Sequence, residues 1–147
     1  EPVTKIASVI SKKKRIRQML KKVQHDLAYN PPKKFKGSIL DGRDIGTVIM
    51  PDAHVKVYLT ASLNVRAIRR YKEYKKMGIK TTLGRVKSDI KKRDYEDTHR
   101  KISSLKPAKD AVLLDSSFYN TKAAFAKIDE VIRNEIKLLN ATKHKSL

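Results

Sequence analysis

Apolar residues recur at the spacing of an α-helix in four stretches of the chain, which predicts four helices. The predicted helices span residues 11–29, 60–77, 81–97 and 121–140. Ser11, Ser62 and either Asn120 or Thr121 are the expected N-terminal caps of three of them, because their side-chain oxygens accept backbone N–H groups. Gly78 is expected to end the second helix.

Three short apolar runs predict buried β-strands. They lie at residues 38–40, 55–59 and 111–114. Because strands alternate with helices along the chain, we expect an α/β fold built on a parallel sheet of crossover units. The sequence has no internal repeat and no linker long enough to separate two domains, so we expect its 147 residues to form one domain.

Charge and composition narrow the class of partner. The chain has 35 Lys and Arg against 15 Asp and Glu, which gives a formal net charge of +20. This balance favours nucleic acid, nucleotides or an acidic surface as the partner. The absence of cysteine excludes disulfides and cysteine-metal sites and fits a reducing compartment. No apolar run approaches the ~20 residues of a membrane span, so we expect no membrane partner.

The basic residues are concentrated in the middle of the chain. Twelve Lys and Arg lie from Arg66 to Arg93, with only two acidic residues among them. Arg66 and Arg70 are four residues apart and share a helix face, with Arg69 beside them. Because the planar guanidinium fork binds phosphate oxygens in pairs, this cluster is compatible with a phosphate-binding region.

Asp97 has an arginine on either side at helical spacing, Arg93 four residues before it and Arg100 three residues after it. One interpretation is a set of ion pairs within a single helix, and spacing alone favours it. The other is a nucleotide site, with the arginines on a phosphate and Asp97 on a ribose hydroxyl.

Asp41 directly follows the first predicted strand. A carboxylate at the carboxyl end of a parallel strand lies at the edge where such sheets bind ligands, and it could contact a magnesium-bound water. The alternative is a turn aspartate that accepts hydrogen bonds from its own backbone. A phosphate loop of the form GxxxxGK(S/T) does not occur in the 147 residues, because Arg43 and Asp44 stand where Lys and Ser or Thr are needed.

Residues 41–48 read DGRDIGTV, and this string resembles the bacterial cytidylate kinases. The likeness continues through further segments and covers nearly the whole chain. These segments are residues 51–53, 55–62, 66–71, 90–94, 105–108 and 110–115. The resemblance implies a three-layer parallel sheet of the P-loop nucleoside monophosphate kinase type. It also implies a monomeric cytoplasmic enzyme of pyrimidine nucleotide metabolism that transfers the γ-phosphoryl group of ATP, with Mg²⁺, to CMP or dCMP.

The resemblance implies seven residues that bind the monophosphate substrate. They are Ser8, Arg17, Arg43, Asp44, Arg93, Asp97 and Arg100. Ser8, Arg17 and Asp44 match residues that read the cytosine, and Asp97 matches a carboxylate at the sugar. The remaining three match arginines that surround the monophosphate.

Four further residues match the family's catalytic machinery. Arg66, Arg69 and Arg70 fall in its mobile lid, where arginines neutralise the transferring phosphoryl group, and Asp41 matches an aspartate near the magnesium ion. No residue is expected to bind the metal directly. The resemblance also divides the single domain into four parts: the end of the monophosphate-binding region, core strands, the lid with its flanking helices, and a core strand with the last helix. These are residues 1–30, 38–62, 63–100 and 105–140.

The sequence departs from the family at its start, because no first strand or phosphate loop precedes Glu1. We therefore expect an incomplete fold that lacks the first strands, and no turnover by these residues alone. The alternative function is a basic nucleic-acid-binding protein on a kinase-like scaffold. The net charge of +20 favours it, but the sequence contains no known nucleic-acid-binding motif, so we expect no specific nucleic-acid partner.

Overall fold

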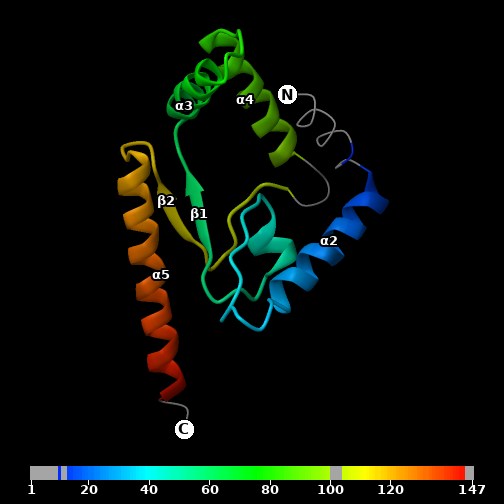
Figure 1. Ribbon diagram of the computed structural model, residues 1–147, viewed down its shortest axis with the longest axis vertical. Helices are drawn as coiled ribbons and strands as arrows, with labels where there is room; N and C mark the ends of the chain where they lie inside the picture. Colours follow the sequence, from blue (N-terminus) through cyan, green and yellow to red (C-terminus); the bar gives the residue numbers. More distant parts are fainter. Residues whose placement is uncertain (1–9, 11–12, 100–103, 145–147) are drawn as a thin grey trace. The chain divides into compact units, whose positions relative to one another are not determined.

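A computed structural model describes residues 10, 13–99 and 104–144 (Figure 1). The chain forms two compact units, Glu1–Pro51 and Asp52–Leu147. The first contains helix α2 and the wide helical turn η1, and the second contains strands β1 and β2 with helices α3, α4 and α5. No helix in the described part of the chain has the length and apolar character needed to cross a bilayer.

In the first unit, the predicted helix is confirmed as α2 (Lys14–Tyr29). It begins after Lys13 rather than after the expected cap Ser11, which lies outside the described residues. The Ser38 hydroxyl donates to the carbonyl oxygen of Ala28 at 2.6 Å, which ties the following connector to the end of the helix.

The predicted strand at residues 38–40 is not formed, and this expectation was wrong. An isolated apolar run gains strand structure only when a neighbouring strand accepts its backbone hydrogen bonds. No described segment of this unit provides one, and Ile39 is 95% exposed. The chain continues instead into η1 (Ile45–Ile49), in which the Met50 N–H donates to the Ile45 carbonyl oxygen five residues back at 2.7 Å.

In the second unit, the other two predicted strands are confirmed as β1 (Val57–Thr60) and β2 (Val112–Asp115). They pair in parallel, with Val57 opposite Val112 and Thr60 opposite Asp115. The protein is therefore an α/β protein with a small parallel sheet. At the amino ends of the strands, Lys56 Nζ lies 2.6 Å from Asp110 Oδ2, and only 7% of the Lys56 side chain is exposed.

Helices α3 (Leu63–Lys76) and α4 (Leu83–Thr98) form a hairpin beyond the end of β1 (Figure 1). The cap expected at Ser62 is confirmed, because Ser62 Oγ accepts the Val65 N–H at 3.3 Å, and Thr82 caps α4. Gly78 adopts a φ of 70° in the connecting turn, a conformation that favours glycine. Ala67 in α3 and Val86 in α4 are the most buried described side chains.

Helix α5 (Thr121–His144) follows β2 and is capped by Asn120, whose Oδ1 accepts the Ala123 N–H at 2.9 Å. In Figure 1 it runs alongside the two strands. The helix continues to His144, beyond the predicted end at residue 140. In this unit α3 therefore begins after the carboxyl end of β1, and α5 begins after the carboxyl end of β2.

Candidate functional site

In the first unit, the structure brings together Arg17 of α2 and Asp44 at the start of η1. Arg17 Nη1 donates to Asp44 Oδ2 at 3.2 Å, and the two side chains are 23% and 20% exposed. They are 27 residues apart in the sequence. Because a guanidinium has five N–H donors and a carboxylate has two acceptor oxygens, the half-buried pair can still bind a ligand that has both donors and acceptors.

The turn before this pair is closely packed. A Cβ atom at Gly42 would lie 2.9 Å from Ile45 Cγ1 and 3.1 Å from Ile45 Cδ1, so a larger residue there would force the Ile45 side chain to move. Arg43 follows and is half-buried, whereas Asp41 is exposed. The absence of a side chain at Gly42, which lies between two predicted site residues, therefore leaves room for Ile45.

Asp41 is exposed and was matched by the resemblance to an aspartate near the magnesium ion. Within the part of the chain that the structure describes, no three His, Cys, Asp or Glu side chains are grouped to hold an ion. One carboxylate supplies too few of the oxygen ligands that Mg²⁺ needs, because the ion requires octahedral oxygen coordination and keeps several waters. The described residues therefore fit a water-mediated contact at most.

In the second unit, two of the predicted lid arginines bind the carboxyl edge of the sheet. Arg66 Nε donates to the Ala61 carbonyl oxygen at 2.8 Å, and Arg66 Nη1 donates to Asp94 Oδ2 at 2.6 Å. Arg69 Nη2 donates to the carbonyl oxygens of Ser116 and Tyr119 at 2.6 and 2.8 Å. Both guanidinium groups thus hold the start of α3 on the strand ends.

Arg70 differs from these two arginines. Its Nη1 pairs with Glu73 Oε2 at 3.1 Å on the exposed surface of α3. The structure therefore does not bring Arg66, Arg69 and Arg70 to a common point, although all three lie on the first two turns of one helix.

The carboxyl edge carries a serine network that the sequence analysis did not identify as part of a site. Ser116 Oγ donates to the Thr60 carbonyl oxygen at 2.9 Å and accepts from Arg69 Nη1 at 3.1 Å. The Ser117 hydroxyl and N–H both donate to Asp115 Oδ1, and the hydroxyl bond is the larger cause of the lowered pKa of Asp115. Ser116 and Ser117 directly follow β2. Their position after the carboxyl end of a predicted parallel strand could have identified them as site residues.

Asp97 and Arg93 lie on α4 as the spacing predicted. Arg93 Nε is 3.8 Å from Asp97 Oδ2, and Asp97 is only 9% exposed. The intrahelical pair expected from the sequence is therefore present. Ser8 and Arg100, which were also predicted to bind the substrate, lie outside the described residues.

These features define an α/β protein with a small parallel sheet and with arginine–carboxylate pairs in each of its two units. The family model for cytidylate kinase matches residues 1–137, and the chain belongs to the cytidylate kinase family. This membership favours the kinase interpretation over the nucleic-acid-binding alternative.

Individual relatives support the same family. The chain is 42% identical over 134 residues to a cytidylate kinase of Leuconostoc mesenteroides, covering 91% of this chain and 58% of the relative. It is 41% identical to that of Streptococcus mutans, over 91% of this chain and 57% of the relative. For Ligilactobacillus salivarius the identity is 40%, over 97% of this chain and 58% of the relative. The chain thus spans a little under three fifths of the length of these relatives.

Proposed function

We propose that the protein to which this chain belongs transfers the γ-phosphoryl group of ATP to CMP or dCMP, forming CDP or dCDP. Family membership supports the reaction, and the relatives are named cytidylate kinases. The observation that carries the substrate choice is the contact between Arg17 and Asp44. It places a donor and an acceptor side by side, which is what a cytosine edge requires.

The chemistry of the base explains this choice. Cytosine presents an exocyclic amino group, which can donate to the Asp44 carboxylate, and a carbonyl oxygen, which can accept from Arg17. Uracil presents a carbonyl oxygen where cytosine has the amino group, so its oxygen would face the Asp44 carboxylate without a proton between them. A site built to hydrogen-bond one group disfavours an analogue that leaves its polar atoms unpaired.

The remaining arginines suit the charge of the reactants. Arg43, Arg93 and Arg100 would donate to the monophosphate, and Asp97 would accept from a sugar hydroxyl, with Ser8 as a further contact to the base. Phosphoryl transfer depends mainly on positioning the reactants and on stabilising the negative charge of the transition state. A magnesium ion would neutralise part of the charge on the ATP phosphates, with Asp41 as the proposed contact to its water shell.

The lid arginines Arg66, Arg69 and Arg70 would stabilise the transferring group. Arg70 is best placed to exchange its partner, because an exposed ion pair such as that with Glu73 contributes only ~0–1 kcal/mol. Arg66 and Arg69 would act only after giving up backbone carbonyl contacts at the sheet edge.

Substituting Asp44 tests the proposal. In the protein that carries this chain, Asp44→Asn should lower kcat/KM for CMP by ~5- to 150-fold, since the half-buried side chain loses the charge that strengthens its hydrogen bond to the base. The KM for ATP should stay unchanged. Asp26→Asn, on the exposed surface of α2, is the matched control and should behave as wild type. A wild-type protein that phosphorylates UMP as well as CMP, or neither, would contradict the proposal.

A further inference from the structure

Helix α4 has two different faces. One carries the buried residues Val86 and Asp97, with Arg93 paired to Asp97, and it belongs to the site described above. The opposite face is exposed at every position and takes no part in that site. We call it the outer face of α4 and define it as Ser88, Lys91, Lys92, Tyr95 and His99.

Two aromatic rings are stacked on the outer face. The Tyr95 and His99 ring centroids are 4.0 Å apart, with an angle of 23° between the planes. His99 Nδ1 lies 2.9 Å from the Tyr95 carbonyl oxygen, which holds the imidazole ring in place. Tyr95 is nevertheless 64% exposed, so its ring contributes little to the packing of the core. The result is a preformed aromatic surface open to solvent.

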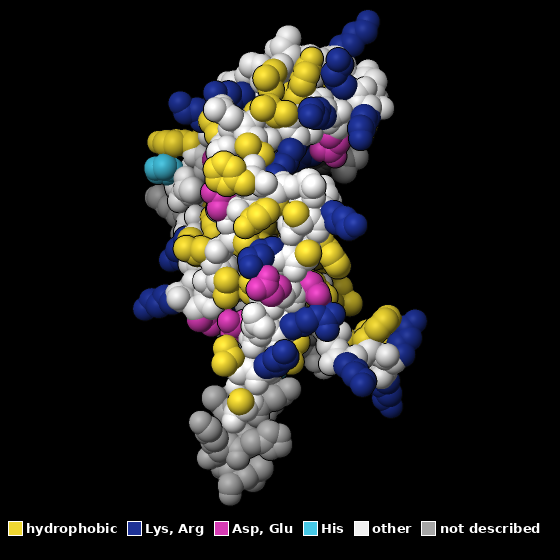
Figure 2. Space-filling view, turned by 90° about the vertical axis from the view of Figure 1, so that its left-hand side faces the viewer, with side chains coloured by type: hydrophobic (Ala, Val, Ile, Leu, Met, Phe, Trp, Pro, Cys, Tyr) yellow, Lys and Arg dark blue, Asp and Glu magenta, His cyan; other side chains and the backbone are white. Residues whose placement is uncertain are grey.

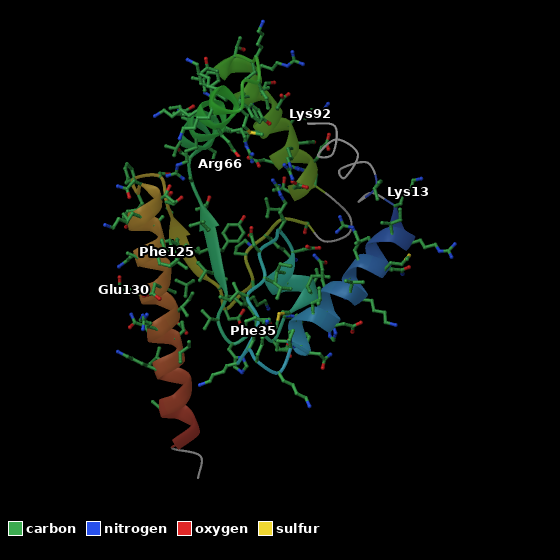
Figure 3. All side chains as sticks on the ribbon, in the orientation of Figure 1. Lys13, Phe35, Arg66, Lys92, Phe125 and Glu130 are labelled. Carbon is green, nitrogen blue, oxygen red and sulfur yellow. The ribbon has the colours of Figure 1, made fainter. Side chains whose placement is uncertain are left out.

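Positive charge adjoins these rings. Lys91 and Lys92 lie one turn before Tyr95, and neither has an ion pair with any residue that the structure describes. Figure 2 shows Lys and Arg side chains spread over the α3–α4 hairpin, and Figure 3 shows Lys92 on α4. No acidic residue belongs to the outer face. An anion approaching it therefore meets two ammonium groups beside an aromatic surface.

We propose that the outer face of α4 binds single-stranded nucleic acid without sequence preference. One base stacks on the Tyr95 and His99 rings, and neighbouring phosphates pair with Lys91 and Lys92. Four residues of helix span ~6 Å, so a phosphate next to the stacked base lies within reach of the Lys91 side chain. Stacking accepts any base because every base has a π-face.

Other anionic partners fit this face less well. A duplex keeps its bases stacked on one another and offers none to the Tyr95 ring. A helix that lies on a membrane buries an apolar face, and this face has no aliphatic side chain. The proposal adds an activity outside the proposed kinase site and does not depend on which nucleotide that site takes.

The test uses a labelled oligothymidylate of about 12 nucleotides that has no terminal phosphate. Its binding is measured by fluorescence anisotropy, with saturating CMP present to occupy the proposed kinase site. Tyr95→Ala should weaken binding by ~5- to 150-fold, and Tyr95→Phe should restore it. Phe118→Ala is the matched control, because Phe118 is 93% exposed in the same unit and lies off the hairpin. In the protein that carries this chain, phosphorylation of CMP should be the same in all three variants, which separates this proposal from the kinase proposal.

Salt dependence gives a second readout. Replacing both Lys91 and Lys92 with Gln should reduce the slope of log K against log salt by ~1.4, since each phosphate contact to a single strand contributes ~0.7. Lys109→Gln combined with Lys122→Gln should change the slope less. The proposal would be overturned if the Tyr95→Ala variant bound the oligonucleotide as tightly as the Phe118→Ala variant. It would also be overturned if the protein bound a duplex as tightly as the single strand, or if CMP displaced the oligonucleotide.

Discussion

Arg66 and Arg70 lie one turn apart on α3 but have different surroundings. Arg66 donates to the backbone carbonyl oxygen of Ala61 and to Asp94, and its side chain is 36% exposed. Arg70 pairs with Glu73, and both of these side chains are about half exposed. Family resemblance assigns the two arginines one role, whereas their contacts indicate that one supports the structure and the other is available to a ligand.

The two arginines should therefore respond differently to replacement by alanine. Arg66→Ala should lower the free energy of unfolding by ~1–3 kcal/mol, because a carbonyl oxygen and a carboxylate lose their donor. Arg70→Ala should lower it by no more than ~1 kcal/mol but reduce kcat, because charge develops on the phosphoryl oxygens in the transition state. Urea unfolding and steady-state kinetics measure the two effects. A loss of CMP affinity at constant kcat in Arg70→Ala would contradict its assignment to the lid.

At the scale of elements, the two strands are held at opposite ends by different polar contacts. Lys56 and Asp110 pair at the amino ends, and Ser116 bonds to Thr60 at the carboxyl ends. Because β1 and β2 are 4 residues each, contacts at both ends fix the register of a short pair. The sheet edge that binds α3 is thus kept in one arrangement.

The amino-end contact predicts a pH dependence. The hydrogen bond from Lys56 is the largest cause of the lowered pKa of Asp110. A carboxyl group whose pKa is lowered by folding stabilises the folded state above its unfolded value of ~3.9, and this contribution is lost as the pH falls through the folded value. Asp110→Asn should therefore make the melting temperature less sensitive to pH below about 4. Asp89→Asn is the control, and an unchanged pH profile in Asp110→Asn would contradict the assignment.

At the scale of the whole molecule, the 147 residues include those proposed to bind the monophosphate and to form the lid, but no GxxxxGK(S/T) loop for the ATP phosphates. The backbone N–H groups and the lysine of such a loop hold the β- and γ-phosphates during transfer. The two compact units, Glu1–Pro51 and Asp52–Leu147, divide the predicted site residues between them.

A polypeptide of these 147 residues alone should therefore release no ADP when mixed with CMP, ATP and magnesium. A coupled ADP-release assay measures this, with a cytidylate kinase that contains the loop as the positive control. Turnover at the ~1–100 s⁻¹ that is usual for kinases would show that the reaction does not need the loop.

The sequence by itself determined the four long helices, the cap at Ser62 and the ion pair between Arg93 and Asp97. These features depend on residues three or four positions apart, so the local chain conformation decides them. Thr82, for example, starts α4 because its side chain accepts a backbone N–H three residues later. The family, too, is indicated by a contiguous string of eight residues, DGRDIGTV, which does not depend on how the chain folds.

Only the tertiary structure decided the contacts between distant residues. Arg17 meets Asp44 across 27 residues and Arg66 meets Asp94 across 28, and no spacing rule predicts either pair. The strand predicted at residues 38–40 failed for the same reason, because a strand exists only where a partner satisfies its backbone groups. Local pattern therefore determined which residues are helical, whereas the path of the chain decided which side chains meet.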